Sequence, residues 1–297
     1  MTGLSKSKIL NKFTIVLFLA PALMLLSFVM IYPIAMGIAM SFSEIELGEF
    51  TLTFKGVQQF EKLFKDPTFW RTVQNSLIWV AGCTAGQFVT GLLLALLLNR
   101  RLPGISVFRI ILLLPWTIPG VVTAFTWFWL YHPDYGMISW VIRIIRGTAL
   151  SILSNENTAL PAVMLVNVWW RYPFAMLMLL AGLQTVPSSH YDAAAIDGAN
   201  SIQVLRHIII PWLRPVITIV LILDTIANLN GFTLVRIMTG GGPGGVTDLF
   251  GILIYRKGFA FFHFEEAAAV SFIVLILAVL LATLYIKIVN RRGGSDE

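Results

Sequence analysis

Residues 191–211, YDAAAIDGANSIQVLRHIIIP, form a polar stretch in a chain whose other long segments are almost free of charge. Apolar runs precede and follow it, and they are long enough to cross a bilayer. A chain that turns polar between two such runs leaves the membrane and re-enters it. The stretch therefore indicates a polytopic membrane protein with a structured loop outside the bilayer.

The composition supports this interpretation. Of 297 residues, 57% are hydrophobic and 12% are charged, about half the ~25% of a typical soluble domain. Strands would leave backbone groups unpaired in lipid, so the spans should be helical. We expect an all-α protein with one transmembrane domain over 1–297 and six spans, at about 13–41, 72–98, 107–131, 158–183, 212–233 and 267–289.

The first span and the loop charges set the expected topology. The uncharged run 13–43 is longer than the 7–15 apolar residues of a signal peptide, so we expect an uncleaved anchor. With the N-terminus in the cytosol, the inner segments carry a net charge of +7 and the outer ones −1, as the positive-inside rule requires. Both termini and residues 191–211 should then be cytosolic. The basic balance reflects topology, and we expect no nucleic-acid partner.

Several chemistries find no support in the sequence. Cys83 is the single cysteine and lies within an apolar run. No spacing typical of a metal site or of a GxxxxGK[ST] phosphate loop occurs. We expect no metal site, no cofactor bound by this chain, and no enzymatic activity of its own.

The polar stretch reads as two short helices with a bend. Ser189–Asp192 has the spacing of a capping box, and Gly198 suits a left-handed C-cap. A residue at 200–201 can cap a second helix running through Ile210, which Pro211 should end. A well-capped connecting loop without a partner remains the alternative.

Three segments on the outer side are also patterned. Residues 54–70 and 136–146 are amphipathic and predict helices at the membrane surface, or helices that merely cap the bundle. Residues 239–245, TGGGPGG, include five glycines, which permit positive φ and close backbone approach. They indicate a specific turn or a surface for another backbone, with a flexible hairpin as the alternative.

The sequence DAAxxDGA beginning at Asp192, followed by IxIP ending at Pro211, resembles the "EAA" loop of permease subunits of binding-protein-dependent ABC importers. Asp192 stands where that family usually has Glu. The resemblance implies a type I permease fold and a coupling helix that sits in a groove of an ATPase subunit. The coupling residues it implies are Asp192, Ala193, Ala194, Asp197, Gly198, Ala199, Ile208 and Pro211.

The resemblance covers nearly the whole chain and is closest to carbohydrate importers related to the maltose permease. It rests on Leu19-Ala20-Pro21, Tyr32-Pro33, Ser41-Phe42, Asp66-Pro67, Phe69-Trp70, Asn75, Arg109, Leu114-Pro115-Trp116, Trp127, Tyr135-Gly136, Met238 through Pro243, Tyr255-Arg256 and Phe259. Glu265-Glu266 departs from the pattern and could act at the outer mouth.

This family implies a location in the bacterial cytoplasmic (inner) membrane, surrounded by membrane lipid. Its partners would be a second homologous permease, two copies of a cytosolic ABC ATPase that bind ATP and Mg, and an extracytoplasmic sugar-binding protein. Gly240, Gly241, Gly242 and Pro243 are the expected docking residues for that binding protein.

Ionisable residues within spans are functional candidates. We expect a substrate pathway at Arg171, Tyr172, Asp224, Asn228 and Asn230, because amides and carboxylates suit sugar hydroxyls. Two neighbouring aromatic residues, Trp169 and Trp170, could stack on a sugar ring. The alternative is structural: Arg171 would pair with Asp224 or a backbone carbonyl.

The expected function is a permease subunit of an ATP-driven carbohydrate importer. A glycerol phosphate or a polyol is the alternative cargo. A proton-coupled secondary carrier would use Asp224 and Arg171, but such carriers often contain internal repeats, and none is convincing here. A membrane-embedded enzyme would need a catalytic constellation that the sequence does not offer.

Overall fold

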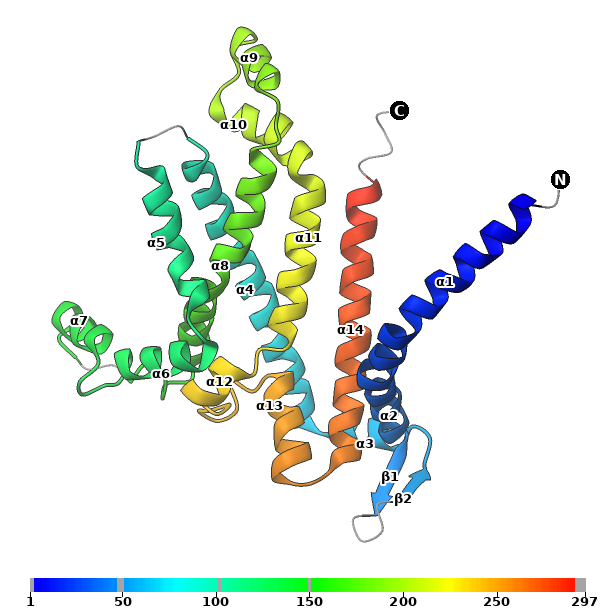
Figure 1. The fold of residues 1–297 in the computed structure, drawn as a ribbon. Helices are drawn as coiled ribbons and strands as arrows, with labels where there is room; N and C mark the ends of the chain where they lie inside the picture. Colours follow the sequence, from blue (N-terminus) through cyan, green and yellow to red (C-terminus); the bar gives the residue numbers. More distant parts are fainter. Residues whose placement is uncertain (1–2, 47–50, 101–102, 149–150, 292–297) are drawn as a thin grey trace.

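The chain folds into a helical bundle with a small hairpin at one end (Figure 1). The structure is a computed structural model, and it describes residues 3–46, 51–100, 103–148 and 151–291. The hairpin pairs β1 (Ser43–Glu46) with β2 (Thr51–Phe54) in antiparallel register. The all-α prediction is confirmed apart from this hairpin.

The α-helices, in chain order, are α1 (Gly3–Leu26), α2 (Tyr32–Ser41), α3 (Gln58–Lys65), α4 (Pro67–Leu98), α5 (Ile105–Thr117), α6 (Gly120–Leu130), α7 (Met137–Arg146), α8 (Ala159–Leu183), α9 (Ser188–Ile196), α10 (Ser201–Val204), α11 (Ile210–Leu229), α12 (Thr233–Met238), α13 (Phe250–Tyr255) and α14 (Phe264–Arg291). Three π-helical turns join some of them: η1 (Ser27–Ile31), η2 (Leu205–Ile209) and η3 (Arg256–Ala260).

Among the described residues, five helical stretches are long and apolar enough to cross a membrane, and α5 with α6 makes a sixth if the pair counts as one bent span. The five are Val16–Ser41, Pro67–Leu98, Ala159–Leu183, Ser201–Met238 and Phe264–Lys287. This agrees with a polytopic fold of six spans.

The segment predicted to span at 107–131 is bent. The axes of α5 and α6 meet at 92°, because Ile118 is extended ahead of Pro119. A residue before proline avoids the α region, and proline has no N–H to continue a helix. The 13 residues of α5 rise about 20 Å at ~1.5 Å each, less than a ~30 Å hydrocarbon core. The chain then turns, and α6 runs across the end of the bundle (Figure 1).

The centre of the bundle is the pair α4 and α8, which approach closely through small residues. A Cβ on Gly91 would lie 2.8 Å from both the Ala175 Cβ and the Met176 backbone nitrogen. A Cβ on Gly86 would lie 2.7 Å from a methyl of Val168. Small residues let helix backbones meet where lipid removes the hydrophobic drive for association. The α4–α8 contact therefore depends on close van der Waals packing between the two helices.

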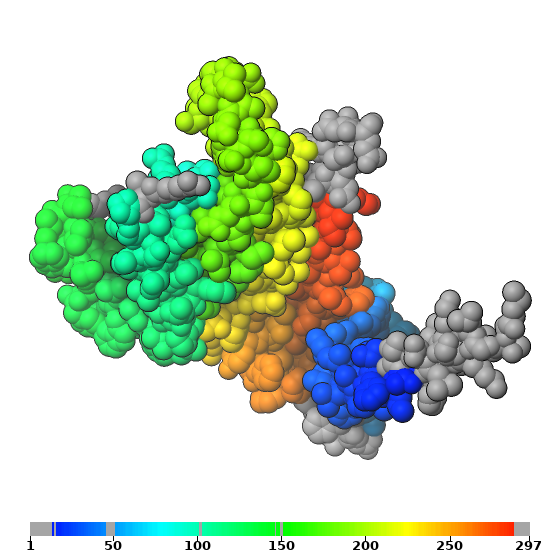
Figure 2. All heavy atoms as spheres, turned by 45° about the horizontal axis from the view of Figure 1, so that its top comes forward, coloured from blue at the N-terminus to red at the C-terminus, as the bar shows by residue number. Residues whose placement is uncertain are grey.

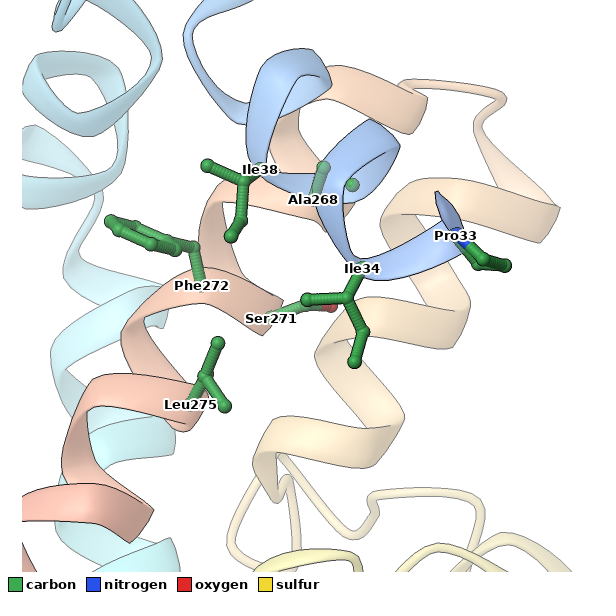
Figure 3. A pocket seen from close by; sticks show the side chains of 8 residues that line it. Pro33, Ile34, Ile38, Ala268, Ser271, Phe272 and Leu275 are labelled. Atoms are coloured by element: carbon green, nitrogen blue, oxygen red, sulfur yellow. The ribbon is translucent and has the colours of Figure 1, made fainter. Parts of the chain in front are cut away.

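The N-terminal arm is largely uncovered. Helix α1 projects away from the bundle, whereas α2 lies against α14 (Figure 1). Within the N-terminal span, Val16–Ser41, the most apolar part contains no buried residue. Figure 3 shows the α2–α14 contact, where Ile34 and Ile38 face Phe272 and Leu275 across an apolar crevice of about 310 Å³. A helix that is apolar on all sides belongs in lipid or against another protein.

The two amphipathic outer segments differ in how they pack. Helix α3 buries Gln59 and Leu63 against the bundle, so it caps the fold. Asp66 accepts a hydrogen bond from the Thr68 backbone N–H at 2.8 Å and so caps the start of α4. Helix α7 leaves Ile144 and Ile145 exposed.

Candidate functional site

Helices α9 and α10 extend beyond the bundle as a knob (Figures 1 and 2). Gly198 has φ +70°, and its N–H donates to the Ala195 carbonyl at 3.2 Å. The Ala199 N–H donates to the Ala194 carbonyl at 2.9 Å. This pair of bonds is a Schellman motif, which needs a left-handed residue at its centre. The predicted glycine bend is confirmed.

The N-terminal caps differ from the prediction. Pro187 is extended and α9 starts directly after it, without a side-chain cap. The capping box predicted at Ser189–Asp192 is therefore wrong, since both residues lie inside the helix. Asn200 caps α10 by accepting from the Gln203 N–H at 2.9 Å. Gln203 Oε1 in turn accepts from the Asn200 N–H at 2.7 Å.

Pro211 does not end the second helix. The turn η2 precedes it, and the Ile210 N–H bonds to the Leu205 carbonyl five residues back. Pro211 then falls in the first turn of α11, where a missing N–H is tolerated. The predicted helix end is wrong. The consequence is a continuous helical rod from α10 through η2 into α11, which joins the exposed bend to the bundle interior.

A groove of about 490 Å³ lies between α9 and the start of this rod. Its lining includes six of the eight predicted coupling residues: Ala193, Ala194, Asp197, Gly198, Ala199 and Ile208. Asp192 is exposed beside the groove. Two large apolar side chains, Ile196 (87% exposed) and Ile202 (76%), face outward from the knob. Burial raises the pKa of Tyr191 above its usual value.

At the opposite end, the glycine-rich loop has a defined backbone. Its glycines at 240, 241, 244 and 245 all have positive φ. Arg71 of α4 donates to the Gly244 carbonyl at 2.7 Å, and Asn75 donates to the Gly245 carbonyl at 2.9 Å. Asp248 accepts from Arg256 at 2.6 Å. The loop is therefore a specific turn that is hydrogen-bonded to α4. The structure favours the predicted specific turn over the alternative of a flexible hairpin.

This loop borders an open hollow of about 370 Å³. Gly240, Gly241 and Gly242 line the hollow, together with Arg71 and Arg256. Three of the four predicted docking residues thus share one concave surface.

The acidic pair in the first turn of α14, Glu265 and Glu266, contacts basic side chains of the same chain. Glu266 accepts from Lys257 at 2.6 Å, and Lys257 also lies 3.8 Å from Asp66. Glu265 is mostly buried and lies 3.7 Å from His263. These contacts join the starts of α4 and α14 near η3. Both glutamates therefore have basic partners nearby in the same chain, and their contacts have a structural role.

A pocket of about 270 Å³ opens inside the bundle between α4, α8, α11 and α12. Its lining residues are Trp79, Asn167, Trp170, Arg171, Ala227, Asn230, Gly231, Phe232, Thr233 and Leu234. Arg171 and Asn230, two of the five predicted pathway residues, are among them.

The other three lie outside this lining. Tyr172 is buried on another side of α8 and donates to the Leu112 carbonyl of α5 at 3.0 Å. Asp224 is 1% exposed, and neither of its carboxylate oxygens has a hydrogen-bond partner among the described residues. Asn228 is 2% exposed behind the pocket wall.

Asn228 is the centre of a buried amide network. Its Nδ2 donates to Thr84 Oγ1 and to Gln87 Oε1, each at 3.0 Å. Its Oδ1 accepts from Asn167 Nδ2 at 2.9 Å. Its backbone carbonyl accepts from Trp79 Nε1 at 3.1 Å. The network joins α4, α8 and α11 and sets the position of two residues in the pocket wall.

The pairing of Arg171 that the structural alternative required is not seen. Within the described residues, no ion pair of 4.0 Å or less joins it to Asp224, and it makes no hydrogen bond to a carbonyl. Its guanidinium lies 5.7 Å from the Trp170 ring centroid. In the part of the chain that the structure describes, no three His, Cys, Asp or Glu side chains gather as a metal site would require.

Sequence reasoning missed Trp79, Asn167 and Thr233. Asn167 had a usable signal, because it precedes Arg171 by one helical turn on the same face. Trp79 lies in an uncharged run and Thr233 begins a short helix, and neither carries a pattern of its own.

Comparisons with known proteins place this geometry in context. The family described as "Binding-protein-dependent transport system inner membrane component" matches residues 87–293. The sulfoquinovosyl glycerol transport system permease protein SmoG of Agrobacterium fabrum is 33% identical over 93% of this chain and 90% of its own length. The trehalose/maltose transport system permease protein MalF of Thermococcus litoralis is 32% identical over 79% of each chain.

A solved structure has the same fold. A chain of the bacterial alginate ABC transporter, in complex with a periplasmic protein bound to an alginate pentasaccharide, superposes with a TM-score of 0.84 at 21% identity. The match covers 97% of this chain and 98% of the other.

Proposed function

This chain belongs to the family of inner membrane components of binding-protein-dependent transport systems, and from that premise we propose that it is a permease subunit of an ATP-driven carbohydrate importer. It is a multi-pass membrane protein. The family match over 87–293, which includes the knob, the rod and all of the pocket lining except Trp79, is the observation that carries the proposal.

Carbohydrate is the cargo that the relatives and the pocket both favour. Relatives named for sulfoquinovosyl glycerol and for trehalose and maltose are similar over most of their length. The pocket is lined by the half-buried indole ring of Trp170 and, at its back, by Trp79, which is 1% exposed, beside the polar side chains of Asn167, Asn230 and Thr233. Aromatic faces with a few placed polar groups suit a ligand that has both an apolar ring face and hydroxyls.

The α9–α10 knob is the proposed coupling site for a cytosolic ATPase. Ile196 and Ile202 are large apolar side chains exposed on the knob, beyond the end of the bundle, which is typical of a protein contact. Asp192 and Asp197 supply charge beside them. Because the rod enters the bundle as α11, a push on the knob would move the pocket wall at Asn230.

The remaining partners follow the same logic. The exposed N-terminal arm would cross to a second, homologous permease, and lipid would cover what that subunit leaves free. The glycine loop, at the end opposite the knob, would receive an extracytoplasmic sugar-binding protein. In this arrangement the chain would lie in the bacterial cytoplasmic (inner) membrane, with both termini and the knob on the cytosolic side.

ATP and Mg would be bound by two ATPase subunits, and this chain would bind no cofactor and catalyse no reaction. Its contribution would be half of a pathway and one coupling surface. A glycerol phosphate or a polyol remains the alternative cargo, favoured by the cationic side chain in the pocket. A proton-coupled carrier would need Asp224 to reach water, but that residue is 1% exposed.

The test is purification of the intact complex from native membranes, followed by reconstitution in liposomes. We expect an ABC ATPase and a second permease to co-purify, and ATP hydrolysis to rise when the binding protein and its sugar are added. Uptake that persists without ATP and stops with an uncoupler would reject this function in favour of a secondary carrier.

A further inference from the structure

The intramembrane pocket has an unusual charge distribution. Arg171 is the only charged residue among the described residues that line it. Its Nε is buried and has no hydrogen-bond partner there. The guanidinium is held beside the Trp170 ring, 5.7 Å from its centroid, and this contact leaves its N–H donors unused. An intramembrane cation without a bonded partner is costly unless something supplies an acceptor.

The nearest acidic candidate does not serve as that acceptor. Asp224 is not among the residues that line the pocket, and it is 1% exposed. No ion pair joins it to Arg171 within the described ranges. Asp224 therefore balances charge in the bundle from behind the wall, while the surface open to a ligand is cationic.

The other polar groups around the pocket are largely committed. Asn167 Nδ2 donates to Asn228 Oδ1 at 2.9 Å, and Asn230 Nδ2 donates to the Ile226 carbonyl at 3.2 Å. The indole N–H of Trp170 donates to the Ile118 carbonyl at 2.9 Å. That of Trp79 donates to the Asn228 carbonyl. Both rings are thus held in place by their N–H groups, and Arg171 provides the charged donors of the pocket, beside the neutral Thr233 hydroxyl.

We propose that this pocket selects a saccharide bearing an acidic group, with the Arg171 guanidinium holding the oxyanion and the fixed indole rings bordering the sugar ring. This inference rests on the proposed function and narrows its substrate class. A guanidinium presents paired N–H donors that match carboxylate and sulfonate oxygens, and such charge-assisted bonds are stronger than neutral ones. A neutral sugar leaves that preference unused.

The test uses the purified complex and three probes: glucuronate, glucose and inorganic sulfate. Binding is measured by calorimetry and by tryptophan fluorescence. We expect glucuronate to bind about tenfold more tightly than glucose, since one charge-assisted contact contributes roughly that factor. Arg171→Gln should bring the two sugars to parity, and Arg171→Lys should retain part of the preference. Arg143→Gln, which removes an exposed arginine from α7, is the matched control and should change nothing.

A second variant separates a ligand site from a structural ion pair. Asp224→Asn removes the opposing negative charge, so glucuronate should bind at least as tightly as in the wild type. If Asp224→Asn lowers glucuronate affinity as Arg171→Gln does, the two residues act as a pair and the inference is overturned. Equal binding of the two sugars, or no binding of either, overturns it as well. Binding of glucose alone overturns it and leaves the carbohydrate permease intact, whereas sulfate binding without either sugar counts against both.

Discussion

Replacing Gly198 with proline should uncouple this protein while leaving it assembled. Proline holds φ near −65°, whereas Gly198 has φ +70°. The variant also loses the N–H that bonds to Ala195 at 3.2 Å. A left-handed conformation costs an ordinary residue ~1–2 kcal/mol, and each lost hydrogen bond of the bend about 1 kcal/mol.

Because the proline ring cannot reach φ +70° at all, the penalty against the bend is at least about 3 kcal/mol, which lowers the population of the bend by about a hundredfold or more. The cost stays local, because Gly198 is exposed and nothing lies within 4 Å of a Cβ built on it. Gly198→Ala pays only the conformational term, about 1 kcal/mol, and should keep a substantial part of the activity.

The assay is sugar-stimulated ATP hydrolysis in liposomes, with size-exclusion chromatography to follow assembly. Gly147→Pro is the matched control. Gly147 also has positive φ (+74°) after a helix, its N–H bonds to the Arg143 carbonyl at 2.8 Å, and nothing lies within 4 Å of its Cβ position. We expect Gly198→Pro to lose stimulation and Gly147→Pro to keep it. Normal stimulation in Gly198→Pro, or equal loss in both, would refute the reasoning.

Three further changes probe the bundle and the outer loop. Gly91→Val should prevent assembly, because its side chain would occupy the space 2.8 Å from the Ala175 Cβ; a normal yield of monodisperse complex would contradict this. Asn228→Ala should lower the thermal stability by about 1–3 kcal/mol, because it leaves buried amides unpaired; a melting temperature equal to that of wild type would show that the network contributes little. Gly241→Ala should reduce stimulation by the binding protein but not basal hydrolysis, since its Cβ would clash with the Asp248 carboxylate; unchanged stimulation would separate this loop from docking.

Much of the fold could be predicted because the requirements of a lipid environment can be checked along the sequence alone, without knowledge of tertiary contacts. Long uncharged runs must be helical and must cross the membrane, so composition alone indicated the spans. The bend between α5 and α6 escaped this rule, since apolar composition is the same on both sides of it. The sequence Ile118-Pro119 is a signal for the bend, but hydropathy does not show a change in the direction of the helix axis.

The knob was predicted in outline and mistaken in detail. Gly198 was identified because a left-handed cap has a strong preference for glycine. Pro211 is not the helix end that the sequence predicts, although proline usually stops a helix. It is accommodated because η2 shifts the hydrogen bonds by one residue ahead of it, and that shift has no local sequence signature.

The pocket was the least predictable part. Arg171 and Asn230 line it, while Asp224 and Asn228 lie behind its wall. All four are polar residues in apolar helices, so polarity marked them equally. Which of them faces a cavity depends on how α8 and α11 are rotated against α4, and packing of small residues such as Gly91 decides that.

If the α9–α10 knob couples this chain to an ATPase, then an ATPase subunit must bind the knob directly. A photo-crosslinking experiment can detect that contact. A photoreactive amino acid is placed at Ile202, which is 76% exposed, and the complex is irradiated in native membranes. Mass spectrometry then identifies the adduct. We expect a covalent adduct with a cytosolic ABC ATPase subunit. Two results would contradict the coupling role of the knob. One is an adduct with an extracytoplasmic protein, and the other is the lack of an ATPase adduct when the photoreactive residue at position 202 still reacts with water.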